Sequence, residues 1–128
     1  MKRIKSALIS VSDKSNLKPL LKILKKNKIK LISSGGTYKA IKKLKFKCLE
    51  VSDFTGANEI LGGRVKTLHP KIYAGILNKR KNKTHLREMR LENFENIDLV
   101  IVNFYQFEKA LKKTKNIDKI IEQIDIGG

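Results

Sequence analysis

The sequence predicts one α/β domain in which a parallel β-sheet carries helices on both faces, in a Rossmann-like three-layer arrangement. Two alternating patterns indicate this fold class. Short aliphatic runs bounded by polar residues are typical of strands buried on both faces of a parallel sheet. Between these runs, apolar residues recur at spacings of three and four, which is typical of amphipathic helices. A length of 128 residues with 41% hydrophobic residues suits a single core, so we expect one domain over 1–128.

The aliphatic runs predict four strands, near residues 4–10, 29–33, 46–51 and 98–103. The clearest run is Leu99–Val102, four consecutive aliphatic residues between Asp98 and Asn103. Because no polar side chain interrupts the run, we expect this strand to be buried on both faces of the sheet.

Helical spacing predicts four helices, which begin near Asn16, follow Gly35-Gly36, and cover residues 83–92 and 117–124. The first helix must start close to Asn16 because Pro19 is tolerated only in a first turn. Residues 53–78, which contain four glycines and Pro70, are interpreted as a long, partly helical loop of the kind that is usually functional.

The net charge is +17, from 29 basic and 12 acidic residues. Of the basic residues 24 are Lys and only 5 are Arg, and Lys, Ile and Asn are amino acids with A/T-rich codons, so compositional bias explains much of the excess. Proteins that read nucleic acids rely on Arg and on aromatic stacking, whereas this chain has 6% aromatic residues and no Trp. A dedicated nucleic-acid reader is therefore not expected, but the positive field should attract small anions.

No apolar run approaches the ~18 to 20 residues that span a bilayer, and the N-terminal segment turns polar at Ser10–Lys14, too early for a secretory signal. Cys48 is the single cysteine, which excludes a disulfide framework. We therefore expect a reduced cytoplasmic protein without membrane partners. The sequence ends at Gly127-Gly128, directly after the last predicted helix, and this ending suggests a truncated domain.

Ligands of open parallel sheets bind beyond the carboxyl ends of the strands, where this sequence places small polar residues. The first strand is followed by Ser12 and Lys14, and the second by Ser34-Gly35-Gly36-Thr37 at the start of a helix. This segment combines the backbone N–H groups of the glycines, hydroxyl side chains and the N-terminus of a helix. Such a combination favours a phosphate cradle, to which Lys14 would add a positive charge. The alternatives are an ordinary Gly-Gly turn and a helix-capping role for Ser12 or Asp13.

The segment Arg64–Pro70 is the second candidate part of a site. If it is extended, Arg64 and Lys66 project to the same side with Thr67 beside them, which offers a planar fork, a point charge and a hydroxyl. The alternative is a pair of solvated charges. His69 is interpreted as a structural loop residue, and a turn-forming role is the alternative for Asp125.

Six segments resemble, in order, the N-terminal IMP cyclohydrolase domain of the bifunctional purine biosynthesis proteins: Ala7–Lys14, Ser34–Thr37, Val51–Gly56, Gly63–Pro70, Asn103–Tyr105 and Ile124–Gly128. The resemblance covers the whole chain and is most specific at Gly63–Pro70. It implies a methylglyoxal-synthase-like α/β fold. It also implies ring closure of formyl-AICAR ribotide to IMP with loss of water, a reaction that uses no cofactor and no metal. Tyr73, Phe104 and Gln106 depart from the family pattern.

The resemblance also implies the site residues. Lys66 and Tyr105 are expected to stabilise or protonate the formyl oxygen, and Asp125 to act as base or acceptor for the carboxamide. The residues expected to bind substrate are Ser12, Lys14, Ser34, Gly35, Gly36, Thr37, Arg64, Thr67, Asn103 and Ile126. The residues expected to surround the phosphate and ribose are Ser12, Lys14 and the Ser34–Thr37 turn. Those expected to line the base end of the site are Arg64, Lys66 and Thr67.

The family continues past the Gly-Gly pair into a helix with a further catalytic lysine, and into a transformylase domain that this sequence lacks. One alternative is therefore an inactive or split nucleotide-binding fragment that a separate polypeptide completes. Others are a small-ligand regulatory module of the same fold and a stand-alone methylglyoxal synthase. The resemblance further implies a homodimer and a purine ribotide as small-molecule partner, and nucleic acid remains an unlikely one.

Overall fold

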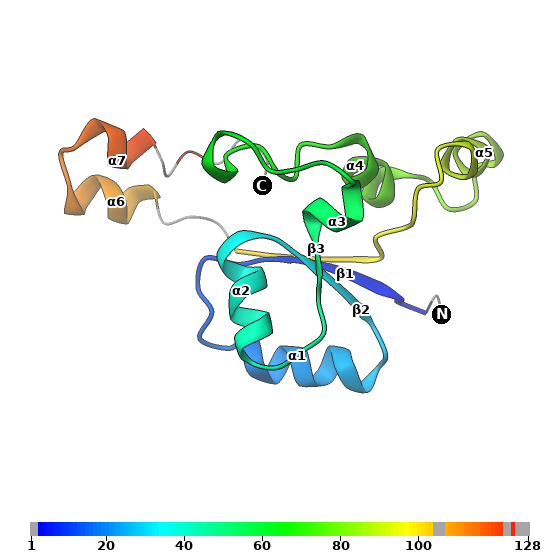
Figure 1. The fold of residues 1–128 in the computed structure, drawn as a ribbon, viewed down its shortest axis with the longest axis horizontal. Coiled ribbons are helices and arrows are strands. Elements are labelled where there is room, and N and C mark those ends of the chain that lie inside the picture. Colours follow the sequence, from blue (N-terminus) through cyan, green and yellow to red (C-terminus); the bar gives the residue numbers. More distant parts are fainter. Residues whose placement is uncertain (1–2, 104–106, 122–123, 125–128) are drawn as a thin grey trace.

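A computed structural model describes residues 3–103, 107–121 and 124. Its centre is a sheet of four parallel strands in the order β3-β2-β1-β4. The strands are β1 (Ser6–Ser10), β2 (Lys30–Ser33), β3 (Leu49–Glu50) and β4 (Leu99–Val102). The parallel sheet and its position between helices confirm the predicted fold class (Figure 1).

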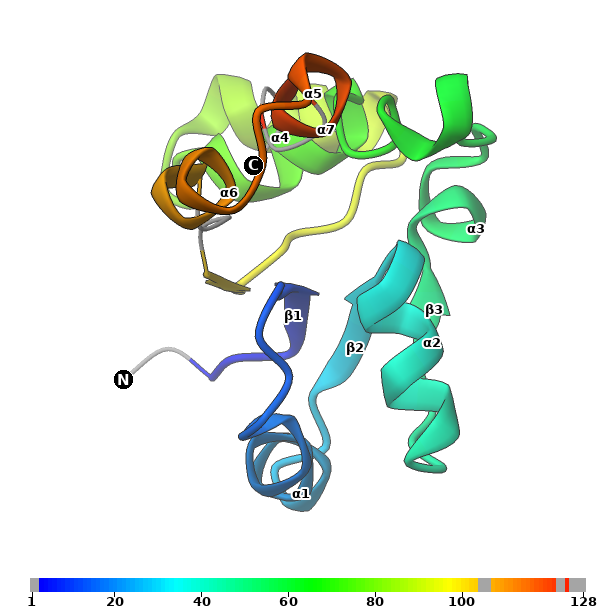
Figure 2. The ribbon, with the colours of Figure 1, turned by 90° about the vertical axis from the view of Figure 1, so that its left-hand side faces the viewer.

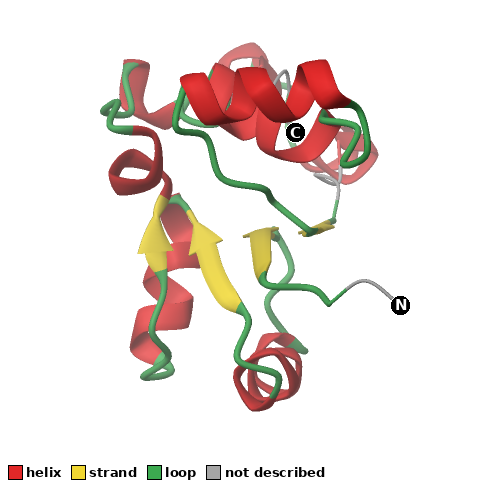
Figure 3. Cartoon of the chain, turned by 90° about the vertical axis from the view of Figure 1, so that its right-hand side faces the viewer, coloured by secondary structure: helices red, strands yellow, loops and turns green. Residues whose placement is uncertain are grey.

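Helices lie on both sides of the sheet. On one side are α1 (Leu17–Lys26) and α2 (Gly35–Lys43), and on the other are α3 (Val51–Thr55), α4 (Pro70–Leu77) and α5 (Lys83–Leu91). A short 3₁₀ turn, η1 (Leu61–Gly63), precedes α4, and α6 (Phe107–Lys113) and α7 (Ile117–Ile121) form a hairpin after β4. Seen along the sheet, the strands separate these two helical layers (Figures 2 and 3).

Each face of the sheet has its own hydrophobic core, because alternate residues of β1 point to opposite faces. Ala7 and Ile9 pack with the buried leucines of α1, whereas Leu8 packs on the α3–α4 side. The first core is formed by Ala7, Ile9, Leu17, Leu21, Leu24, Leu31 and Ile41, and the second by Leu8, Ile32, Val51, Phe54, Ile72 and Ile97. The two central strands are therefore buried on both faces, as their aliphatic runs predict.

The expectation for β4 is wrong in one respect. Leu99 and Ile101 pack against the first core, but Val100 and Val102 remain 39% and 47% exposed. The reason is the neighbouring layer: Val100 shares a face with its partner Leu8 of β1, but none of the residues of β4 joins the second core, which covers Leu8. An aliphatic run shows that a strand can be buried on both faces. Which faces are buried depends on the helices that pack against the strand.

Residues 53–78 are more regular than the predicted loop. Val51–Thr55 is helical, so the third strand shrinks to Leu49–Glu50 from the predicted 46–51. Pro70 begins α4 rather than breaking it, because a first helical residue needs no hydrogen-bonded N–H. The other predicted helices are confirmed, and α7 is described over Ile117–Ile121, with residues 122–123 of the predicted helix outside the described residues.

Both helices of the first layer end in a Schellman motif. After α1, Ile29 N donates to Leu24 O and Lys28 N to Lys25 O, and after α2 the turn at Lys45 and Phe46 repeats this pattern. The motif places Lys28 and Lys45 at φ of 56° and 62°, in the left-handed region where glycine is favoured.

Replacing Lys28 and Lys45 by glycine is therefore expected to stabilise the protein, by about 0.5–1 kcal/mol at each position. Urea unfolding of Lys28→Gly and Lys45→Gly measures the gain. Lys22→Gly, at an exposed position inside α1, is the matched control and should lose about 1 kcal/mol. Equal losses at all three positions would contradict the strain at Lys28 and Lys45.

Cys48 lies half-buried at the rim of the first core. Burial raises the pKa of its thiol to about 11, with a smaller lowering effect from Lys42 and a further raising effect from Glu50. In the unfolded state the thiol ionises near its ordinary pKa of 9.0. Between that pH and the folded pKa of about 11, ionisation of the thiol therefore stabilises the unfolded state more than the folded state.

The free energy of unfolding is therefore expected to fall between about pH 9 and 11, and Cys48 contributes no such slope below pH 9. Comparing urea unfolding of the wild type and Cys48→Ala at about pH 8 and 10 isolates this part, because the lysines titrate in both proteins. Parallel pH profiles for the two proteins would show that the thiol does not contribute.

Candidate functional site

The register of the sheet brings the candidate residues to one edge. Ile9 of β1 is paired with Ser33 of β2 and with Ile101 of β4, so the three strands end at the same level. The segments that follow them, which begin at Val11, Ser34 and Asn103, therefore meet beyond the carboxyl edge of the sheet, as the position rule for parallel sheets predicts.

Thr37 locks the segment after β1 onto the start of α2. Its Oγ1 accepts a hydrogen bond from Val11 N at 3.1 Å and donates one to Val11 O at 3.0 Å. Below it, Ser33 Oγ donates to Ile9 O at 2.6 Å. Both side chains are buried. The hydroxyl of Thr37 thus fixes the segment after β1 to the start of α2. The sequence patterns did not indicate that the backbone of Val11 takes part in this link.

Asn103 joins the end of β4 to the same segment. Its Oδ1 accepts from Ser12 N at 2.6 Å and from Ser12 Oγ at 2.8 Å, and its Nδ2 donates to Asp13 O at 3.2 Å. Asn16 occupies the N-cap position of α1, so the capping alternative for Ser12 and Asp13 is wrong. The structure instead uses Ser12 and Asn103 to fix the two strand ends together.

Two ammonium groups flank the first turn of α2. A Cβ added to Gly35 would lie 3.0 Å from Lys66 Nζ, and one added to Gly36 would lie 3.9 Å from Lys14 Nζ. Gly35 has φ of 54°, a conformation that favours glycine. Lys14 Nζ is steered there by Val11 O and Ser12 O, at 3.0 and 3.2 Å. We call Lys14, Lys66 and the Ser34–Thr37 turn the cradle.

The electrostatics of the cradle favour an anion. A helix N-terminus carries partial positive charge from its unbonded N–H groups, and two ammonium groups add to it. Ser34, the N-cap residue, makes no side-chain capping bond. Within the described part of the chain, neither Lys14 nor Lys66 forms an ion pair with an acidic side chain. Phosphate, sulfate and carboxylate groups are the anions that helix N-termini bind.

The structure brings some of the predicted site residues together and leaves others apart. Lys66 approaches Gly35 in the first turn of α2, next to residues that the resemblance assigns to the phosphate and ribose, although the resemblance assigns Lys66 itself to the base end. Arg64 follows η1 as an exposed residue, and Thr67 is half-buried in the next turn. Tyr105, Asp125 and Ile126 lie outside the described residues. The roles of all of these residues stay predictions.

His69 has the structural role expected from the sequence. It is the N-cap residue of α4, and its Nδ1 accepts a hydrogen bond from Lys71 N at 3.1 Å. Its own N–H donates to Thr67 O at 2.9 Å. The histidine thereby connects the start of α4 to the turn that carries Lys66.

His69→Ala is expected to lower the free energy of unfolding by about 0.5–2 kcal/mol, because it removes the cap of α4. His69→Asn restores an N-cap acceptor and should recover most of the loss. Urea unfolding of both variants measures the two effects. If asparagine does not recover stability, the contribution of His69 does not come from its hydrogen bond to Lys71.

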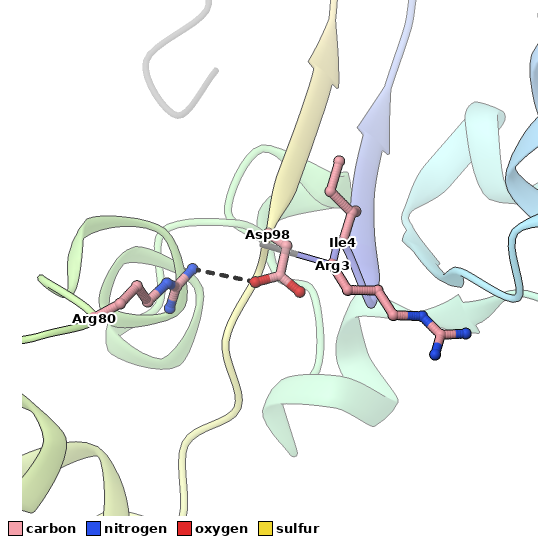
Figure 4. A pocket seen from close by; sticks show the side chains of 4 residues that line it. All are labelled: Arg3, Ile4, Arg80 and Asp98. Carbon is pink, nitrogen blue, oxygen red and sulfur yellow. Dashed lines mark ion pairs between the residues drawn. The ribbon is translucent and has the colours of Figure 1, made fainter. Parts of the chain in front are cut away.

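A small hollow at the opposite edge of the sheet is lined by Arg3, Ile4, Arg80 and Asp98 (Figure 4). Arg80 points toward Asp98, whereas the guanidinium of Arg3 is turned away. Arg80 Nη2 donates to the carbonyls of Gly75 and Ile97, at 3.0 and 2.8 Å, and lies 3.8 Å from Asp98 Oδ1. Since its donors are occupied by the backbone, we interpret Arg80 as a clamp between α4 and the start of β4.

The described residues offer neither a metal site nor a helix that could span a membrane. They contain no group of three or more His, Cys, Asp or Glu side chains placed to hold a metal ion. None of the helices in residues 3–103 and 107–121 is long and apolar enough to cross a membrane. The cytoplasmic location expected from the sequence stays a prediction.

Comparisons with known proteins agree with this architecture. A family model described as the MGS-like domain matches residues 16–128. The bifunctional purine biosynthesis protein PurH of Prochlorococcus marinus (strain MIT 9301) is 49% identical over 123 residues, which are 95% of this chain and 24% of that protein. PurH of Buchnera aphidicola subsp. Schizaphis graminum is 51% identical over 126 residues, 98% of this chain and 24% of its own length.

A solved structure titled "Crystal structure of ForH" superposes with a TM-score of 0.81 at 32% identity, and the match covers 98% of this chain and 64% of that one. The chain therefore spans about a quarter of the length of the PurH relatives and about two thirds of the ForH chain. The match over residues 16–128 and the shared fold together show that this chain belongs to the MGS-like domain family, in which it corresponds to the N-terminal IMP cyclohydrolase domain of the PurH proteins.

Proposed function

We propose that this chain binds a purine ribotide through its phosphate and acts as an IMP cyclohydrolase, closing the ring of formyl-AICAR ribotide to IMP with loss of water. The observation that carries the proposal is the convergence of Lys14 and Lys66 on the first turn of α2. The similarity to PurH proteins supports the substrate class, because these relatives are named for purine biosynthesis.

The reaction joins the carboxamide nitrogen to the formyl carbon, so one N–C bond forms and the nitrogen loses a proton. The formyl oxygen carries the developing charge, takes up this proton and the proton of the formamido nitrogen, and leaves as water while its C–O bond breaks and a C=N bond to the formamido nitrogen forms. An amide nitrogen is a weak nucleophile, so the two groups must be held in attack geometry, and the phosphate provides the handle for this. A base and an oxyanion donor supply the remaining assistance.

The cradle supports the first of these requirements. Lys14 Nζ, Lys66 Nζ and the amides of the first turn of α2 would surround a phosphate, and the Ser12–Asn103 hydrogen bonds keep the neighbouring strand ends rigid beside it. In this proposal Arg64, Thr67 and the backbone at Ile126 contact the ribotide beyond its phosphate. In the same proposal Tyr105 serves the formyl oxygen and Asp125 serves the carboxamide, whereas Lys66, whose Nζ lies beside Gly35, is assigned to the phosphate instead of the formyl oxygen.

The test is turnover of formyl-AICAR ribotide by the purified full chain, beside calorimetric titration with IMP. Cyclisation above the spontaneous rate that is lost in Asp125→Asn, with IMP binding retained, supports the enzyme. Binding of IMP without cyclisation favours the alternative of a nucleotide-binding fragment or regulatory module. If IMP and inorganic phosphate both fail to bind, the assignment of the cradle is wrong.

The partners expected from the sequence are part of the same proposal. If a second copy or a separate polypeptide completes the site, turnover per chain rises with protein concentration or on addition of that polypeptide. Sedimentation at the concentrations used for turnover separates a homodimer from a monomer. Turnover that is independent of concentration in a monomeric sample would contradict completion by a second copy.

A further inference from the structure

The layer formed by α1 and α2 carries ten exposed lysines and no acidic residue. Between Lys14 and Leu49 the sequence contains neither Asp nor Glu, so all twelve acids of the chain lie outside this stretch. Bias toward lysine in the composition raises the number of lysines, but it does not clear acids from one layer only. The ten side chains belong to Lys18, Lys22, Lys25, Lys26, Lys28, Lys39, Lys42, Lys43, Lys45 and Lys47.

These lysines form one surface, which we call the lysine face. Both helices cover the same side of the sheet (Figure 2). Lys25 Nζ of α1 lies 5.7 Å from the ring centroid of Phe46, which stands between Lys45 and Lys47 in the turn after α2. The turn after α2 thus packs against the end of α1, so the lysines of the two helices form one continuous positive surface. The lysine face lies on the layer of α1 and α2, whereas the cradle lies beyond the carboxyl edge of the sheet.

Carboxylates of the described residues do not pair with the lysine face. Among the described residues none of its ten lysines forms an ion pair; the lysine that does so with a carboxylate is Lys30, which lies 2.9 Å from Glu95. Ten like charges on one layer repel one another and destabilise the compact state. The unpaired charge of the face therefore favours a partner that supplies the counter-charge.

The composition of the face indicates the kind of partner. All five arginines lie elsewhere, so the face offers point charges without the planar fork that reads bases. Phe46 is half-buried under Lys25 and does not provide a stacking surface. Within α1 and α2, Ile23 is the exposed large apolar side chain, which is too little for the apolar core of a protein interface or for insertion into a membrane.

We propose that the lysine face binds the phosphate backbone of a nucleic acid without reading its bases. Such binding is electrostatic and releases condensed counterions, so its affinity falls linearly with salt on a logarithmic scale. This activity is independent of the cradle. It also agrees with the scarcity of Arg and aromatic residues, which argues against a sequence-specific reader.

The experiment uses the full chain and two fluorescent probes, an oligouridine of about 20 nucleotides and a DNA duplex of about 20 base pairs, titrated at several salt concentrations. One variant replaces Lys18, Lys22, Lys26, Lys39 and Lys43 by Gln. The matched control replaces five exposed lysines outside the face by Gln, namely Lys79, Lys81, Lys83, Lys112 and Lys115. The two variants have the same net charge, and thermal unfolding confirms that both are folded.

We expect the face variant to bind at least tenfold more weakly than the control, and its logarithmic salt slope to shrink by about 3 to 4. Excess IMP should not displace either probe. Equal losses in the two variants would show that net charge alone is responsible and would overturn the proposal. Displacement by IMP would do the same, because it places the probe in the cradle. Binding to phosphatidylserine vesicles but to neither probe would assign the face to a membrane surface.

Discussion

Lys14→Met and Lys66→Met are each expected to weaken binding of IMP by about 10- to 100-fold, because each removes a charged hydrogen bond to the phosphate. Both Nζ atoms lie close to the glycine pair that begins α2. Their effects should not add in the double variant, since the two lysines would contact the same phosphate. Calorimetric titration with IMP measures all three variants.

The same substitutions are expected to stabilise the free protein slightly, because they relieve two like charges at the positive end of a helix. Lys81→Met, at an exposed position outside the cradle, is the control and should change neither quantity. Weaker binding without a gain in the melting temperature would contradict the electrostatic part of this account. Unchanged binding in both variants would contradict the cradle itself.

Gly75→Ala is expected to destabilise the fold strongly, although it adds a single methyl group. An added Cβ would lie 2.9 Å from Glu95 O and 3.1 Å from Ile97 Cγ1, because α4 packs directly against the segment that precedes β4. Gly75 O also accepts hydrogen bonds from Ile97 N and Arg80 Nη2, at 2.9 and 3.0 Å. Because backbone stands in the way, the helix must shift, at a cost of about 1–3 kcal/mol.

Gly56→Ala is the matched control for Gly75→Ala. Nothing lies within 4 Å of a Cβ at Gly56, so its loss reflects only its φ of 78° and should be about 1 kcal/mol. Urea unfolding gives both values. For Gly75→Val the loss should increase further, as the second and third carbons enter the same contact. A smaller loss at Gly75 than at Gly56 would show that α4 can move away from residues 95–97 freely.

The parts of the fold that depend on local pattern are predictable from the sequence. The leucine spacing of α1 and the buried runs of β1 and β2 are confirmed because helical and strand periodicities report directly on the faces that meet a core. The exposed side of β4 could not be predicted, since Leu99–Val102 has the aliphatic pattern of the central strands, whereas the second core includes neither Val100 nor Val102. Burial there depends on the helices that pack against the strand rather than on composition.

The candidate site divides in the same way. Ser34–Thr37 and Lys14 could be nominated because polar residues after parallel strands share an edge. The approach of Lys66 to Gly35 joins residues 31 positions apart through a loop whose path no periodicity describes. The link from Thr37 to Val11 was missed for another reason: it uses the backbone of an apolar residue, which motif reading ignores.

The central position of β1 affects how the chain folds during synthesis. β1 pairs with β2 soon after it in the sequence, but its other partner, β4, follows only after the whole of α1–α5. On a ribosome that adds roughly 5–20 residues per second, the second edge of β1 stays unpaired for about 5–20 s. Such late, non-local pairing slows folding and exposes a strand edge to other chains. We therefore expect refolding of this small domain to be limited by docking of β4, at a rate far below that of its helices.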